Sequence, residues 1–418
     1  MTTSLPTQPA DASPARPAQP VAPGIYSFLV REITGWRNDG MVSDELAREL
    51  IARYQPTRSF SLARLILGLG AAFLGFGVIW LVAANLDQLS PLLRFVVVAL
   101  FWIAALVGAE YLATRRAHRG TIPSPVVGAA RGVAALAFGA VLFQAAQSLQ
   151  VPAFEPRLLG LWSLGALLQA YLFRGLAPLV IGLLTGGAWV LASTLASATD
   201  ALSVLQALFA AGIIGASVAV LHHRFVGEGP GRPGGIPTSF AAPWRTVGSG
   251  LTLIALFAAA VPQLTSDNYQ VSTQLVVILV LAAIAFAAAL ILCRGRDRWE
   301  PLGALVASLI GMVLVLWEAG ADPDQVGAAD WGHAAFAVAS YVLVAGWIAV
   351  LGVLRDEDWL TWIATAALVI FTTFQSFAVF AQIIEGAWLF ILLGVIFLLT
   401  GYLFDRARRE VVATLEGN

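Results

Sequence analysis

The side chains of this 418-residue chain that could do chemistry are polar residues inside long apolar runs. Gln144 and Gln147 lie in one run, Gln169 in the next and Gln375 near the C-terminus. A polar group in lipid is costly, so each is a functional candidate, although most such groups hydrogen-bond a neighbouring helix and only stabilise packing. Gathered around a cavity, these amides would bind a polar solute. The spacing leaves both interpretations open.

A second polar group flanks the loop between the first two apolar runs. Asn85 and Asp87 follow the first run, and Arg94 stands near the start of the second. Asp87 could pair with Arg94 across this turn. One interpretation is a loop anchor in which Arg94 snorkels to the membrane interface. The other is an external gate, or a mouth that attracts anions.

The remaining titratable residues do not form a catalytic pattern. Glu110 lies close to Arg115 and Arg116 in sequence, which predicts an ion pair at the membrane interface rather than a proton relay. His222 and His223 are adjacent, and adjacent helical side chains do not share a face and therefore do not chelate a metal. Protease, hydrolase and phosphate-loop motifs are missing from the sequence. We expect no catalytic residue, no metal site, no cofactor and no enzymatic activity.

The composition of the chain indicates which medium surrounds the folded protein. The chain is 59% hydrophobic and only 12% charged, whereas soluble domains carry about 25% charged residues. Its apolar runs have the length of about 20 residues that crosses a hydrocarbon core at 1.5 Å per residue. The net charge of −1 gives no basis for binding nucleic acid. With one cysteine, Cys293, no intrachain disulfide can form. The lipid bilayer is therefore the expected environment.

The apolar runs predict an all-α, polytopic transmembrane helix bundle. About twelve spans are expected, and the count is least certain around residues 158–196, where only three residues separate two runs. The spans lie near residues 63–84, 92–113, 132–149, 158–173, 176–196, 201–222, 247–264, 274–293, 302–320, 333–354, 359–380 and 386–404. With this count, almost every arginine outside the spans falls on one side, with Arg94 and Arg157 as exceptions. Because basic loops stay in the cytoplasm, both termini are predicted there.

The N-terminal segment before the first span divides into two parts. Residues 1–24 are rich in proline and predict a disordered tail. Residues 25–60 predict a cytoplasmic hairpin of two amphipathic helices, the second capped by Ser43. The hairpin is too short for a core of its own, so we expect it to dock on the membrane domain or on a partner. The transmembrane domain spans 61–405, and 406–418 form a cytoplasmic tail. No removable signal peptide is expected, so the first span would act as the anchor.

Several of these residues carry a resemblance to a known family. They are Trp36, Gly40 and Tyr54 of the hairpin, the run ending in Ala83, Ala84, Asn85, Leu86 and Asp87, and then Pro91, Arg94, Gln147 and Trp162. In these residues the chain resembles the predicted bacterial membrane proteins grouped as domain of unknown function 2157, over about its first 190 residues. It implies a bacterial inner-membrane protein of uncharacterised activity and transfers no catalytic residue.

The combined candidate binding set is Asn85, Asp87, Arg94, Gln144, Gln147, Trp162 and Gln375. The sequence supports two functions about equally. The first is a transporter or channel for a small solute. The second is a non-catalytic scaffold or regulator that docks a protein partner through the hairpin. An intramembrane enzyme ranks last, because no acid, base and metal set is present. Oligomeric state and substrate identity are left open.

Overall fold

The computed structural model describes residues 19–21, 23–56, 90–119, 124–152, 155–197, 200–226, 240–261, 271–317 and 327–375, with isolated positions between 66 and 77 and at 269 and 395. The chain divides into two units, Met1–Leu69 and Gly70–Asn418. The first predicted span (63–84) and the last (386–404) lie almost entirely outside the described residues, as do Asn85 and Asp87.

Residues 19–56 of the first unit, as far as the structure describes them, contain two helices and two short strands. Helix α1 (Pro23–Asn38) is followed by α2 (Asp44–Ala52), and strands β1 (Gln19–Val21) and β2 (Tyr54–Pro56) pair in parallel, with Gln19 opposite Tyr54. The turn between the helices contains Gly40 at φ 72°, a conformation that glycine adopts without strain. Ser43 caps α2 by accepting a hydrogen bond from the Leu46 amide at 3.2 Å. The N-cap predicted for Ser43 is therefore present.

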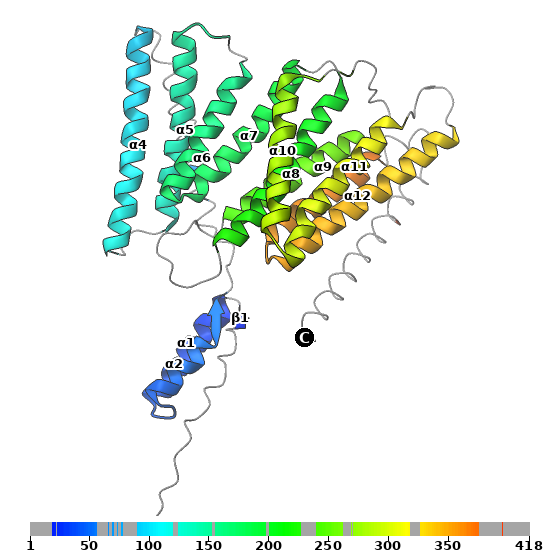
Figure 1. The fold of residues 1–418 in the computed structure, drawn as a ribbon. Helices are drawn as coiled ribbons and strands as arrows, with labels where there is room; N and C mark the ends of the chain where they lie inside the picture. The colour runs from blue at the N-terminus through cyan, green and yellow to red at the C-terminus, as the bar shows by residue number, and fades with distance from the viewer. Residues whose placement is uncertain are drawn as a thin grey trace, which may run out of the picture. The chain divides into compact units, whose positions relative to one another are not determined.

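The second unit is built from helices (Figure 1). A short 3-10 helix, η2 (Gly295–Arg298), precedes α11. The α-helices are α4 (Pro91–Arg119), α5 (Ser124–Ser148), α6 (Pro156–Phe173), α7 (Leu176–Ser197), α8 (Ala201–Val226), α9 (Ala241–Ala259), α10 (Thr273–Leu292), α11 (Trp299–Leu316), α12 (Ala328–Leu354) and α13 (Asp358–Gln375).

Seven helices in the described ranges are long and apolar enough to cross a membrane. They include segments of α4, α5, α7, α8, α10, α11 and α12. The prediction of a polytopic helical bundle is confirmed, while the total of twelve spans stays a prediction. In the region where the count was least certain, α6 and α7 are separate helices. Arg174, at φ 54°, ends α6 in the left-handed conformation and reverses the chain.

Helix α8 lies at the centre of the second unit and packs against α7, α9, α10 and α11. Its closest approach is to α9, where Gly215 and Gly248 face each other. A Cβ atom at Gly215 would lie 2.6 Å from the Gly248 Cα. Small residues permit such backbone contact between helices in lipid. The largest buried cluster joins α8 and α9 to α11, α12 and α13, and it includes Phe209, Leu256 and Tyr341. These five helices position the charged residues described next.

Candidate functional site

A buried ion pair joins α9 to α11. Arg245 Nε donates to Glu300 Oε2 at 2.7 Å, and the two side chains are only 3% and 2% exposed. Arg245 is the fifth residue of α9, and Glu300 is the second residue of α11. A carboxylate in the first turn of a helix is stabilised by the helix dipole. An isolated charge at this depth would be very costly, so each residue requires the other.

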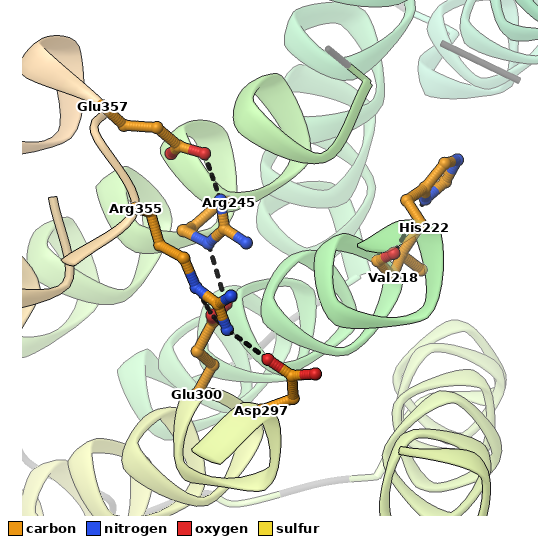
Figure 2. A network of polar contacts seen from close by, with 7 residues as sticks. All are labelled: Val218, His222, Arg245, Asp297, Glu300, Arg355 and Glu357. Carbon is orange, nitrogen blue, oxygen red and sulfur yellow. Dashed lines mark hydrogen bonds and ion pairs between the residues drawn. The ribbon is translucent and has the colours of Figure 1, made fainter. Parts of the chain in front are cut away.

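The pair extends into a network of five charged residues (Figure 2). Arg355, which follows α12, donates from Nε to Glu300 Oε1 and from Nη2 to Asp297 Oδ1, both at 2.6 Å. On the other side, Arg245 Nη1 donates to Glu357 Oε1, in the turn between α12 and α13. The network thus runs from Glu357 through Arg245, Glu300 and Arg355 to Asp297, with alternating charge.

The network contains more acidic than basic residues. Three carboxylates and two guanidinium groups carry a formal charge of −1 when all are ionised. Burial lowers the pKa of Arg355, but the Glu300 and Asp297 carboxylates raise it further, so the net pKa lies above its usual value. Burial raises the pKa of Glu357, which Arg245 only partly opposes. Burial therefore favours the protonated form of Glu357, and binding of one proton there removes the excess charge.

A cavity of about 30 Å³ adjoins the network. A cavity needs roughly 10–15 Å³ to hold one water molecule, so this cavity has room for about two. Its walls come from four helices. The lining residues are Gly212 and Ala216 of α8, Arg245, Ser249 and Thr252 of α9, Glu300, Gly303, Ala304 and Ala307 of α11, and Val344, Trp347, Ile348 and Leu351 of α12.

The polar lining of the cavity follows one face of α9. Arg245, Ser249 and Thr252 are spaced by four and then three residues, which places them on one face over about 10 Å of helix. The Thr252 hydroxyl donates to the Gly248 carbonyl at 3.0 Å. Arg245 Nη2 is buried and has no hydrogen-bond partner among the residues that the structure describes. Arg245, one of the residues that line the cavity, therefore has a buried donor nitrogen without an acceptor in the described residues.

A separate ion pair links α4 to α5. Arg131 donates to both oxygens of Glu110, from Nε and Nη2, each at 2.7 Å. The sequence placed Glu110 with Arg115 and Arg116, so the partner predicted there was wrong. Arg115 instead lies over the ring of Tyr111, 4.9 Å from its centroid. An acid and a base 21 residues apart can meet only through helix packing, which neighbouring sequence does not reveal.

His222 belongs to a hydrogen-bonded chain that crosses three helices. Its Nδ1 lies 2.7 Å from the Val218 carbonyl, and its Nε2 lies 3.0 Å from the Tyr171 hydroxyl. Because a carbonyl only accepts, Nδ1 carries the proton and Nε2 accepts from Tyr171. The Tyr171 oxygen in turn accepts from the Trp244 indole at 2.9 Å. Both ring nitrogens of His222 are thus engaged, and no metal-binding group of three residues exists in the described part of the chain.

The predicted glutamines do not gather at the cavity. Gln144 is buried on α5, Gln147 is exposed on the same helix, and Gln375 is buried at the end of α13. None of the three is among the residues that line the cavity. The Gln375 amide nitrogen has no partner in the described ranges. Gln169 donates to the Arg131 carbonyl at 3.2 Å, a contact that ties α6 to α5.

Trp162 and Arg94 also do not belong to the charged network. Trp162 on α6 donates from its indole nitrogen to the Ala135 carbonyl on α5, at 2.9 Å. Arg94 is half-buried in the first turn of α4. The proposed pairing of Arg94 with Asp87 cannot be followed, because Asp87 lies outside the described residues. The candidate binding set from the sequence therefore stays a proposal.

The seven long apolar helices in the described ranges define the class of this chain as a multi-pass helical membrane protein. Residues 34–179 match the model of a family described as predicted membrane proteins, domain of unknown function 2157. The resemblance proposed over about the first 190 residues is thereby confirmed. The match ends in α7, so the network from Arg245 to Glu357 lies outside it. No curated protein and no solved structure matches the chain.

Proposed function

We propose that this protein moves a small, neutral, polar solute across the bacterial inner membrane, with the cavity beside Arg245 as its solute site. The observation that carries the proposal is the buried Arg245 Nη2, a donor without a described partner on a cavity wall. A buried donor without an acceptor loses about 1–3 kcal/mol. A solute oxygen at this atom recovers that energy, which is the physical basis of binding.

The charges around Arg245 select the class of solute. The guanidinium group itself opposes a cation. An anion is opposed by the Glu300 and Glu357 carboxylates, both bonded to Arg245. A neutral molecule with an acceptor oxygen, such as water, a small amide or a small polyol, meets neither penalty. The cavity has room for about two water molecules, so its volume favours the smallest of these solutes, and a polyol enters only if the cavity widens.

The buried network supplies charged groups that the apolar runs of the sequence largely lack. Coupled carriers generally need ionisable groups within the helix bundle. In the linear sequence, Arg245 and Arg355 belong to loops beside the spans. Their packing against Glu300 brings them into the bundle, next to a cavity that follows α9 for about two turns. We propose that both termini and this end of α9 face the cytoplasm, as the distribution of arginine predicts.

A flux measurement tests the transport function. Full-length protein in liposomes would be mixed with an osmotic step of urea or glycerol, and the vesicle volume followed by light scattering. Wild-type vesicles should equilibrate faster than protein-free vesicles. Ser249→Leu, which adds bulk at the cavity wall, should return the rate towards the protein-free value. Gly250→Leu is the matched control on the same helix, because a Cβ there meets nothing within 4 Å. Equal rates in wild-type and protein-free vesicles would contradict the proposal.

One observation favours a second function, a non-catalytic scaffold. In the first unit, Phe28, Trp36 and Leu46 are 56%, 41% and 43% exposed. Exposed apolar side chains on short helices are typical of protein-docking surfaces. Photo-crosslinking from Trp36 in cells would test this function. A defined protein adduct would support the scaffold, and adducts to this chain and lipid alone would remove its main support.

A further inference from the structure

Glu357 is the least satisfied acid of the charged network. Its Oε1 accepts from Arg245, whereas its Oε2 is buried and has no hydrogen-bond partner in the ranges described. The side chain is 14% exposed. Glu300 differs, because both of its oxygens accept from arginine. An ionised oxygen that is buried without a donor is costly, so the protonated form of Glu357 is favoured relative to water.

The backbone holds this carboxyl in a fixed place. The Glu357 amide donates to the Gly352 carbonyl at 2.8 Å, and its carbonyl accepts from the Leu360 amide at 3.0 Å. Gly352 is close to the start of α13, since a Cβ there would lie 2.9 Å from the Thr361 amide nitrogen. Glu357 therefore belongs rigidly to the α12–α13 turn, while its partner Arg245 belongs to α9. The ion pair is a polar connection between these parts, in addition to the apolar packing of α9 against α12 and α13.

Charged groups from every neighbouring element act on Glu357. Arg245 of α9 favours its ionised form, and Glu300 of α11 opposes it. Arg355, at the end of α12, favours ionisation and is itself shared with Glu300 and Asp297 of η2. Asp356 and Asp358 flank Glu357 in the turn. With three acids and two bases, the network becomes neutral when one proton is bound.

We infer that Glu357 is a proton-binding site, and that its protonation frees Arg245 to bind solute in the cavity. One proton passes from water to the Glu357 carboxylate, an O–H bond forms, and the formal charge of the network changes from −1 to zero. Arg245 then keeps one ionised partner, Glu300, instead of two. The weaker hold on Nη1 lets the guanidinium group turn its donors towards the cavity. The second half of this inference rests on the proposed transport function.

Infrared spectroscopy tests the proton site without any transport. A pH titration of the purified full-length protein should show the carbonyl stretch of a buried carboxylic acid that disappears as pH rises, above the range of ordinary carboxyls. Glu357→Gln should remove this band, and Glu357→Asp should retain a titrating band at a shifted pH. Asp358→Asn, which removes a neighbouring exposed carboxylate, should leave it unchanged. A band that is unaffected by Glu357→Gln would overturn the assignment.

Flux measurements then test the coupling. In wild-type vesicles, solute flux should rise several-fold as pH falls through the range in which the band appears, and in Glu357→Gln vesicles it should no longer depend on pH. Wild-type flux that ignores pH while the band titrates would overturn the coupling. A titrating band in a protein that carries no tested solute at any pH would uphold the proton site and overturn the transport function. Failure of the two proposals can therefore be told apart.

Discussion

Arg245 and Glu300 lie on different helices, 55 residues apart, and meet through a 2.7 Å hydrogen bond in which neither side chain is more than 3% exposed. This contact fixes α9 against α11 beside the cavity. Since Glu300 also binds Arg355, a single carboxylate holds two arginines from different parts of the chain. The stability of this region should therefore depend on Glu300 more than on any acid at the surface.

Replacing Glu300 with alanine should be strongly destabilising. The change leaves Arg245 and Arg355 without their shared carboxylate, and loss of one partner of a buried pair costs about 3–5 kcal/mol. Thermal unfolding in detergent would measure the loss. Glu155→Ala is a control with a smaller expected loss, about 1 kcal/mol, because Glu155 only caps the first turn of α6 through the Arg157 amide and forms a surface ion pair with the exposed Arg157 side chain in the described part of the chain. Equal melting temperatures for the two variants would show that the network contributes little to the fold.

The contact between α8 and α9 should not tolerate a methyl group. In Gly215→Ala, the new Cβ would lie 2.6 Å from the Gly248 Cα and 2.8 Å from the Trp244 carbonyl oxygen. Both are backbone contacts, so the helices must separate, at a cost of about 1–3 kcal/mol. Gly250→Ala on α9 has open space and should be neutral or slightly stabilising. Comparable thermal stability for the two alanine variants would be evidence against this packing.

A double-mutant cycle should detect the pair between Glu110 and Arg131. We expect Glu110→Gln and Arg131→Gln to destabilise separately and to be non-additive by about 0.5–3 kcal/mol, because the two-point contact is partly shielded from water. The same cycle with Glu110 and Arg115 should give additive changes. Unfolding in detergent measures all the variants. Coupling to Arg115 instead of Arg131 would favour the pairing expected from neighbouring sequence.

The pH dependence of stability should carry the signature of Glu357. Burial raises the pKa of this carboxyl in the folded protein above its unfolded value. Between those two values the folded state binds more protons than the unfolded state, so stability falls as pH rises through this window. Glu357→Gln should flatten that part of the profile of melting temperature against pH. A profile in which wild type and variant stay parallel would argue against the raised pKa.

The sequence predicted the helical membrane class, and it did not single out the charged residues of the site proposed beside Arg245. Apolar run length and hydropathy are local properties, so α4, α5, α7 and α8 fall close to their predicted spans. Arg245, Glu300 and Arg355 meet only through the packing of α9, α11 and α12, which no local pattern encodes. The spacing of Arg245, Ser249 and Thr252 on one face of α9 was the available signal. This shared face was missed because the predicted span began at residue 247, which placed Arg245 in a loop.

Predictions based on single polar residues in spans are also limited, because the position of each side chain depends on helix packing. Gln144, Gln147 and Gln375 are polar groups in apolar helices. The sequence does not show which face of each helix points into the bundle. In the structure, Gln147 is exposed, while Gln144 and Gln375 are buried away from the cavity beside Arg245. The charged residues just outside the spans turned out to be better candidates, because helix ends from several parts of the chain converge there.

The most direct measurement of the central claim is whether water-soluble molecules reach Ser249. The chain contains one cysteine, Cys293, which is buried and can be changed to alanine to give a background without thiols. In that background, Ser249→Cys in membrane vesicles should react with a small, neutral thiol reagent, and urea or glycerol should slow the reaction. Ala255→Cys on the same helix, at a fully buried position outside the cavity, should stay unreactive. A Ser249→Cys variant as inert as Ala255→Cys would contradict the account.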